Sequence, residues 1–121
     1  MSEILVVEDD PQQRSEIQAA LVQAGHRADI ASSGNEGVAH LKKKRYDLLL
    51  TDLMMEQGTG FEVLEWVREN APGLPVIICS SYAKGENLKT FLTTQFFRII
   101  RKPLRMDDLV EQVRELLAAA S

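Results

Sequence analysis

Ile4-Leu5-Val6-Val7-Glu8-Asp9-Asp10 is the stretch of sequence that decides the fold of this chain. Its four apolar residues predict a short strand buried on both faces, as in a parallel sheet. Three acidic residues follow directly. Asp10 and Pro11 then predict a helix start, because aspartate caps helix N-termini and proline is tolerated at the first helical position. The stretch therefore predicts a buried strand, an acidic strand end and a helix in succession.

Three further apolar runs also end on polar residues that can take part in chemistry. Residues 48–51 lead into Asp52, residues 76–79 into Ser80, and residues 99–101 into Lys102. The carboxyl ends of parallel strands meet at one edge of a sheet, and open α/β sheets bind their ligands there. We therefore expect an acidic cluster, a hydroxyl and an ammonium group to lie close together at this edge.

Strand-like and helix-like segments alternate along the whole chain. The patterns predict strands at residues 4–7, 27–31, 46–51, 75–79 and 96–100, and helices at residues 11–24, 34–44, 61–70, 84–93 and 105–119. Gly25 is well placed to end the first helix, and Pro72-Gly73 breaks the third. This alternation predicts a single doubly wound α/β domain over residues 1–121, with a five-stranded parallel sheet and helices on both faces.

The composition argues against several classes of protein. The 14 basic and 18 acidic residues give a formal charge of −4, without the global basic footprint of a nucleic-acid-binding protein. We expect neither a membrane span nor a secretory signal. The single cysteine, Cys79, is expected to be a buried, inert thiol in a cytosolic protein. The run Lys42-Lys43-Lys44-Arg45 is interpreted as a solvated helix end and not as a partner patch.

The residues at the expected sheet edge can form a phosphoryl-acceptor site. Glu8, Asp9, Asp10 and Asp52 bring three or four carboxylates together, which would repel one another. Mg²⁺, which prefers oxygen ligands, relieves this repulsion. A carboxylate beside Mg²⁺ can act as a nucleophile and form an aspartyl phosphate. Lys102 can neutralise a carboxylate or phosphoryl oxygen, and the Ser80 hydroxyl can donate to it. Each residue alone also has an ordinary structural explanation, but their joint occurrence favours the site.

These motifs resemble the signature of two-component response regulator receiver domains. The resemblance rests on residues 4–10, Asp52-Leu53-Met54-Met55, the strand ending at Ser80, and Lys102-Pro103-Leu104, and it covers essentially the whole chain. It implies a flavodoxin-like (βα)5 fold with strand order 2-1-3-4-5. It also implies a cytoplasmic phosphoprotein that transduces signals by phosphorelay.

The resemblance also implies a role for each site residue. Asp52 is the phosphoacceptor and also a Mg²⁺ ligand, Asp9 is a direct Mg²⁺ ligand, and Glu8 supports the metal through water. Met54 lends its backbone carbonyl to the metal. Ser80 is the switch hydroxyl, which moves to a phosphoryl oxygen. Lys102 forms an ion pair with the Asp52 carboxylate or with the phosphoryl group. A cis peptide bond is expected before Pro103, and Asp10 is expected to be a helix cap.

The implied partner is a sensor histidine kinase or phosphotransfer protein, which supplies the phosphoryl group from phosphohistidine. The domain catalyses its own phosphorylation and dephosphorylation without being a conventional turnover enzyme. Phosphorylation is expected to change the surface of the fourth helix, fifth strand and fifth helix, where a second copy or an effector protein would bind. Direct contact of this domain with nucleic acid or membrane is not expected.

The sequence departs from the family pattern in two places. The loop after Asp52, usually Met-Met-Pro-Gly-Met-Asp-Gly, reads Met54-Met55-Glu56-Gln57-Gly58-Thr59-Gly60, and Ile99 replaces the switch aromatic. We expect at least one of Phe96 and Phe97 to be ordinary core and not a substitute switch. The departures leave a second hypothesis open: a receiver-like interaction module whose phospho-switch is atypical or lost. A Mg²⁺-dependent change in Trp66 fluorescence, or in amide shifts near Asp9, is expected to separate the two.

Overall fold

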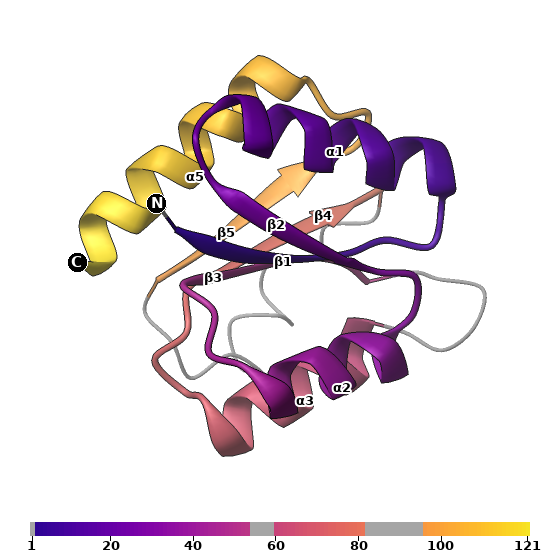
Figure 1. Cartoon of the computed structure of the whole chain (residues 1–121), viewed down its shortest axis with the longest axis vertical. Coiled ribbons are helices and arrows are strands. Elements are labelled where there is room, and N and C mark those ends of the chain that lie inside the picture. Colours follow the sequence, from indigo (N-terminus) through magenta and orange to yellow (C-terminus); the bar gives the residue numbers. More distant parts are fainter. Residues whose placement is uncertain (1, 54–59, 82–95) are drawn as a thin grey trace.

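Five parallel strands form one sheet in the order β2-β1-β3-β4-β5 in this computed structural model, which describes residues 2–53, 60–81 and 96–121 (Figure 1). The strands are β1 (Glu3–Val7), β2 (Arg27–Ala31), β3 (Leu48–Asp52), β4 (Val76–Ser80) and β5 (Phe97–Arg101). The strand order and the parallel direction confirm the prediction from sequence. Because β1, β3 and β4 occupy the centre, their residues are shielded on both faces.

Helices cover both faces of the sheet, as predicted (Figure 1). The helices α1 (Pro11–Gln23) and α5 (Met106–Ala120) lie on one face, and α2 (Gly34–Lys43) and α3 (Gly60–Asn70) lie on the other. The helix expected over residues 84–93 lies outside the described residues. Among the helices that are described, none combines the length and the apolar character needed to cross a membrane.

The ends of α1 follow from its sequence. The Asp10 carboxylate accepts a hydrogen bond from the Gln12 backbone N–H at 3.0 Å, and Pro11 begins the helix. At the other end, Gly25 has a φ of +97°. Its N–H bonds to Val22, and the N–H of His26 bonds to Leu21, both at 3.0 Å. This is a Schellman motif, in which glycine accommodates the left-handed backbone. Both predicted helix signals are therefore confirmed.

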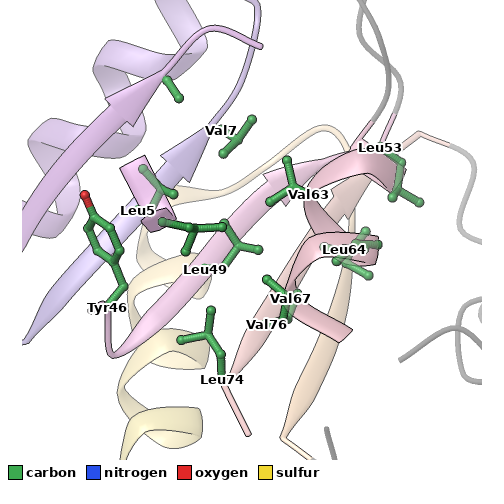
Figure 2. Close-up of a cluster of buried hydrophobic side chains, with 13 residues drawn as sticks. Leu5, Val7, Tyr46, Leu49, Leu53, Val63, Leu64, Val67, Leu74 and Val76 are labelled. Carbon is green, nitrogen blue, oxygen red and sulfur yellow. The ribbon is translucent and has the colours of Figure 1, made fainter. Parts of the chain in front are cut away.

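The core is divided by the sheet into two clusters. Along β1, Leu5 and Val7 point to the α2 and α3 side while Ile4 and Val6 point to the α1 and α5 side, because side chains alternate along a strand. Figure 2 shows the first cluster, where side chains of α3 meet those of the strands: Leu5, Val7, Leu49, Val63, Leu64, Val67 and Val76. All five residues of β3 and of β4 are buried. This anchoring holds the carboxyl ends of the central strands in place.

Some element boundaries differ from the sequence prediction. The third strand begins at Leu48 and not at Tyr46, and both β3 and β4 continue to the polar residues Asp52 and Ser80. Pairing of Asp52 with Cys79, and of Ser80 with Arg101, extends the sheet to these positions. The two polar residues are thus the last residues of strands and not the first of loops.

Two expectations about single residues have different outcomes. Cys79 is fully buried, as expected, and burial raises the pKa of its thiol to about 12. Lys42 and Lys43 lie in the last turn of α2, as expected, but Lys44 is not simply a solvated helix end. Its ammonium lies 2.8 Å from Glu3 and 2.9 Å from Asp29, because the chain turns back toward the sheet there.

Candidate functional site

The sheet register brings the predicted polar residues to its carboxyl edge. Val7 lies beside Thr51 in the β1–β3 pair, so Glu8 and Asp52 directly follow neighbouring positions. Asp52 in turn lies beside Cys79, and Ser80 beside Arg101. Lys102 follows β5, and its N–H donates to the Ser80 carbonyl at 3.1 Å. Residues separated by up to 94 positions in sequence therefore meet at one edge.

Three carboxylates form a cluster at this edge. Glu8, Asp9 and Asp52 each offer an oxygen within 4.8 Å of the others. Glu8 and Asp52 are only 1% and 5% exposed, and Asp9 is half-buried. Like charges held this close disfavour one another's ionised form, whereas a hard divalent cation favours it. The donor set, all oxygen and largely buried, fits a magnesium ion.

The Lys102 ammonium group partly neutralises the carboxylate cluster. Its ammonium lies 2.7 Å from Asp52 Oδ2 and 3.0 Å from Glu8 Oε2. Three carboxylates and one ammonium leave a formal charge of −2. This deficit matches the charge of one divalent cation. Lys102 follows the edge strand β5, and its side chain extends past β4 to reach Asp52 and Glu8.

The burial of these groups changes their proton affinity. Burial raises the pKa of Glu8, the charge of Asp52 adds to this, and the hydrogen bond from Lys102 opposes it. For Lys102, burial alone would lower the pKa. Hydrogen bonds to Asp52 and Glu8 outweigh it, and the pKa lies above its ordinary value of 10.5. Lys102 therefore stays protonated at neutral pH and remains bound to the two carboxylates.

Comparison with known proteins agrees with this geometry. The family model described as the response regulator receiver domain matches residues 4–114. This chain belongs to that family. Because the match extends over all the strands, the receiver-domain assignment covers the whole described sheet.

Curated relatives of this receiver domain are longer response regulators. It is 32% identical over 111 residues to the transcriptional regulatory protein DltR of Streptococcus agalactiae, covering 92% of this chain and 50% of that protein. It is 30% identical over 116 residues to the transcriptional regulatory protein ZraR of Salmonella typhimurium, covering 96% of this chain and 26% of that protein. The chain thus spans half of the first relative and about a quarter of the second.

Solved receiver domains have the same fold. A CheY-like response regulator receiver domain protein from Methanospirillum hungatei has a TM-score of 0.88 at 28% identity, with 99% of this chain and 96% of that chain covered. The response regulator TrrA from Thermotoga maritima, solved in complex with Mg²⁺ and BeF, has a TM-score of 0.83 at 27% identity, with 96% and 99% covered. These similarities confirm the flavodoxin-like architecture expected for the receiver domain.

The other predicted site residues of the receiver domain have different outcomes. Ser80 is fully buried at the end of β4. The peptide bond between Lys102 and Pro103 is cis, as expected. Met54, expected to offer its carbonyl, lies outside the described residues, as do residues 55–59 of the atypical loop. The expected metal ligands that are described, Glu8, Asp9 and Asp52, all lie in the cluster.

The neighbourhood of Ile99 is part of the core. Ile99 and Phe97 are half-buried and pack against the α2 and α3 cluster, whereas Phe96 packs against the α1 and α5 cluster. The expectation that at least one of the two phenylalanines is ordinary core is confirmed. Trp66 lines a hollow at the amino edge of the sheet together with Tyr46 and Pro75. Trp66 is therefore a poor reporter of Mg²⁺ at the opposite edge, and amide shifts near Asp9 are the better one.

One residue at the site was not singled out from the sequence. Arg14, on α1, donates from Nη1 to the carbonyl oxygens of Glu8 at 2.9 Å and of Asp9 at 3.4 Å. The available signal was a cation in the first helical turn after an acidic run, where the helix dipole disfavours positive charge. Such a cation needs a partner, and the strand-end carbonyls provide it.

Proposed function

We propose that this receiver domain accepts a phosphoryl group on Asp52 as a step in a phosphorelay. The observation that carries this proposal is the position of the Asp52 carboxylate, which is buried at a strand end, 2.7 Å from the Lys102 ammonium and clustered with Glu8 and Asp9. A nucleophilic carboxylate needs a counter-charge that also stabilises the incoming phosphoryl oxygens. These groups lie at the ends of three strands, β1, β3 and β5, so the fold itself assembles them.

In this proposal Asp9 and Asp52 bind Mg²⁺ directly, Glu8 binds it through water, and Met54 adds its backbone carbonyl. When bound, Mg²⁺ supplies positive charge to the oxygens of the phosphoryl group and holds it beside the nucleophile. The buried carboxylate cluster with its formal charge of −2 supports this assignment. The Mg²⁺ and BeF complex of the TrrA relative supports it as well.

The transfer step uses the Asp52 carboxylate as nucleophile. One Asp52 oxygen attacks the phosphorus of a phosphohistidine on a partner protein, and a new O–P bond forms. The P–N bond breaks, and its electron pair stays on the imidazole, which takes up a proton. Lys102 then moves its ion pair from the carboxylate to a phosphoryl oxygen, so its charge remains neutralised throughout. Hydrolysis of the aspartyl phosphate by water restores the starting state.

We propose that Ser80 reads the phosphorylated state. Its hydroxyl would donate to a phosphoryl oxygen and pull the end of β4 toward Asp52. Because Ser80 pairs with Arg101, this movement reaches β5 and the start of α5. The shift favours one of two conformations that already exist. The output surface then consists of β5, α5 and the segment at residues 84–94, where a second copy or an effector protein would bind.

The partner that supplies the phosphoryl group is proposed to be a sensor histidine kinase or a phosphotransfer protein in the cytoplasm. DltR and ZraR are transcriptional regulatory proteins, and this chain matches only a part of each. We propose that residues 1–121 act as one receiver domain, which contacts proteins and does not itself bind nucleic acid. The formal charge of −4 supports this division of roles.

The proposal is tested by incubating the protein with acetyl phosphate and Mg²⁺ and measuring its intact mass. Wild-type protein is expected to gain one phosphoryl group, and chelation of Mg²⁺ by EDTA should prevent the gain. Asp52→Asn should remain unmodified. Asp10→Asn is the matched control, because asparagine also caps helices and Asp10 lies outside the carboxylate cluster. Equal labelling of wild type and Asp52→Asn would exclude Asp52 as the acceptor.

A second candidate function is an interaction module without a phospho-switch, and Ile99 favours it. A branched aliphatic side chain packed against the core cannot undergo the swing of an aromatic ring. The two functions differ in what phosphorylation does to β5 and α5. Amide shifts confined to the neighbourhood of Asp52 after phosphorylation would favour the interaction module. Shifts that extend through β5 and α5 would favour the switch.

A further inference from the structure

We propose that Arg14 is a positioning residue that fixes the Mg²⁺-binding turn after β1. This inference rests on the proposed function, because it concerns how the metal-binding carboxylates are held. Arg14 Nη1 donates to the backbone carbonyls of Glu8 at 2.9 Å and of Asp9 at 3.4 Å. The guanidinium therefore hydrogen-bonds to the backbone of both proposed metal-binding residues.

The contacts of Arg14 are with the backbone and not with the acidic side chains. Among the residues that the structure describes, the guanidinium forms no ion pair with a carboxylate. The side chains of Glu8 and Asp9 thus remain available to the cluster while their carbonyl oxygens are held. A guanidinium that presents its donors in a fixed plane is suited to this task, because its direction is set once its stem is packed. Arg14 is half-buried, as this function requires.

The rest of the turn depends on the same few bonds. The Glu8 N–H donates to the Ala31 carbonyl at 3.0 Å, which ties the start of the turn to β2. The Asp10 N–H donates to Glu8 Oε1 at 3.2 Å. Between these two points, the Arg14 side chain donates to the Glu8 and Asp9 carbonyls. Loss of the guanidinium would remove the bonds to both of these carbonyls.

The placement of Arg14 is unfavourable for the helix itself. It is the fourth residue of α1, whose first turn contains no acidic residue. A cation near a helix N-terminus opposes the helix dipole, so the local helix gains nothing from it. The hydrogen bonds to the strand-end carbonyls offset this cost. An arginine at this position is therefore explained by the turn and not by helix formation.

The positioning role and a purely electrostatic role predict opposite results. If Arg14 acted only through its charge, its removal would strengthen Mg²⁺ binding, because one cation near the site would be lost. If it positions the turn, its removal weakens Mg²⁺ binding, as loss of groups that orient metal ligands does. The sign of the change in the Mg²⁺ dissociation constant therefore distinguishes the two roles.

The test is a Mg²⁺ titration, without phosphodonor, followed through the amide shifts near Asp9. Arg14→Gln should raise the dissociation constant about ten-fold. Arg14→Lys, which keeps the charge but not the planar guanidinium, should raise it by less. Arg45→Gln is the matched control, because it removes the same charge at the exposed amino edge of the sheet. Arg45→Gln should bind Mg²⁺ like wild type.

An unchanged or lower dissociation constant in Arg14→Gln would overturn the positioning role. If that variant fails to fold, as judged by thermal unfolding, Arg14→Lys carries the test, and wild-type affinity in it overturns the inference. A failure of the proposed function has a different signature. In that case wild type and Arg45→Gln would themselves show no Mg²⁺-dependent shifts near Asp9.

Discussion

Asp52 is buried, whereas the other aspartates that the structure describes are exposed or half-exposed. It is 5% exposed, it contacts the Lys102 ammonium, and two further carboxylates lie close by. Asp10, only two residues after Glu8, is exposed and caps α1. A carboxylate therefore becomes a candidate nucleophile through its position at the sheet edge, and its residue type alone is not sufficient.

Replacing Lys102 tests the role of the ammonium. Lys102→Ala leaves the three carboxylates without their internal cation, so Mg²⁺ should bind more tightly in a titration. Phosphorylation of Asp52 should nevertheless become about 10²-fold slower, because a group that stabilises the phosphoryl oxygens in the transition state is lost. The measurement is the rate of mass gain with acetyl phosphate at saturating Mg²⁺. Lys43→Ala, in the exposed last turn of α2, is the control.

Tighter metal binding combined with slower phosphorylation would support two separate roles for Lys102. A Lys102→Ala rate equal to that of wild type would contradict its proposed role in the transfer step.

The site residues at strand ends could be predicted from sequence, whereas Arg14 could not. Glu8, Asp52, Ser80 and Lys102 each follow an apolar run, and the carboxyl ends of parallel strands share one edge of a sheet. Arg14 belongs to a helix with polar residues on both sides, and its partners are backbone oxygens, which no sequence pattern identifies. Side-chain to backbone contacts between elements become visible only in the folded chain.

At the scale of elements, helix ends were predicted better than strand ends. Asp10 and Gly25 determine their helix ends through local bonds, which depend on residue type. Strand limits depend on pairing with neighbours that are distant in sequence. For this reason β3 begins two residues later than predicted, and β4 and β5 each extend one residue further toward the carboxyl edge.

The contact between α2 and β1 can be tested at Gly37. A Cβ built there would lie 2.8 Å from Val7 Cγ2 and 3.4 Å from Val63 Cγ2, so alanine overfills the interface. Gly37→Ala should lower the free energy of unfolding by about 1 kcal/mol. The estimate combines about 2 kcal/mol of overpacking with a gain of about 1 kcal/mol in helix propensity. Urea denaturation measures the change.

Gly73→Ala is the control for this substitution, because a Cβ there meets no atom within 4 Å. Its free energy of unfolding should stay close to that of wild type. A Gly37→Ala protein as stable as wild type would show that α2 can move away from β1 without cost.

Near the amino edge of the sheet, Asp29 of β2 binds two side chains from the segment that precedes β3. Its carboxylate accepts a hydrogen bond from the Tyr46 hydroxyl at 2.6 Å and from Lys44 at 2.9 Å. The hydrogen bond from Tyr46, followed by that from Lys44, holds the pKa of Asp29 below its ordinary value of 3.8. A lowered carboxyl pKa stabilises the folded protein at pH values above the ordinary pKa. This stabilisation is lost as pH falls through the lowered pKa of the folded state.

Tyr46→Phe should therefore reduce the free energy of unfolding at neutral pH by about 0.5 kcal/mol, a value discounted for the partial exposure of Asp29. The difference from wild type should shrink as pH falls through the pKa of Asp29 in the folded protein. Urea denaturation over a series of pH values measures it. A difference that stays constant down to the acid limit would show that Asp29 does not depend on this hydroxyl.

At the scale of the whole molecule, the sheet separates two edges with different charge arrangements. The amino edge pairs its acids with Lys44 and Arg27, whereas the carboxyl edge gathers three acids, two of which pair with Lys102. The order of elements was predictable from the alternation of apolar runs and helices, and the strand order from the resemblance to receiver domains. The depth of burial at each edge depends on the packing of both layers, and it could not be predicted from the sequence.

The central claim, that Asp52 receives the phosphoryl group, is tested most directly by locating the modification. After reaction with acetyl phosphate and Mg²⁺, borohydride reduces an acyl phosphate to an alcohol, and tandem mass spectrometry identifies the residue that carries it. The account predicts one modified residue, Asp52, with Glu8 and Asp9 unchanged. Modification of Glu8 or Asp9 in place of Asp52, or no modification at all, would contradict it.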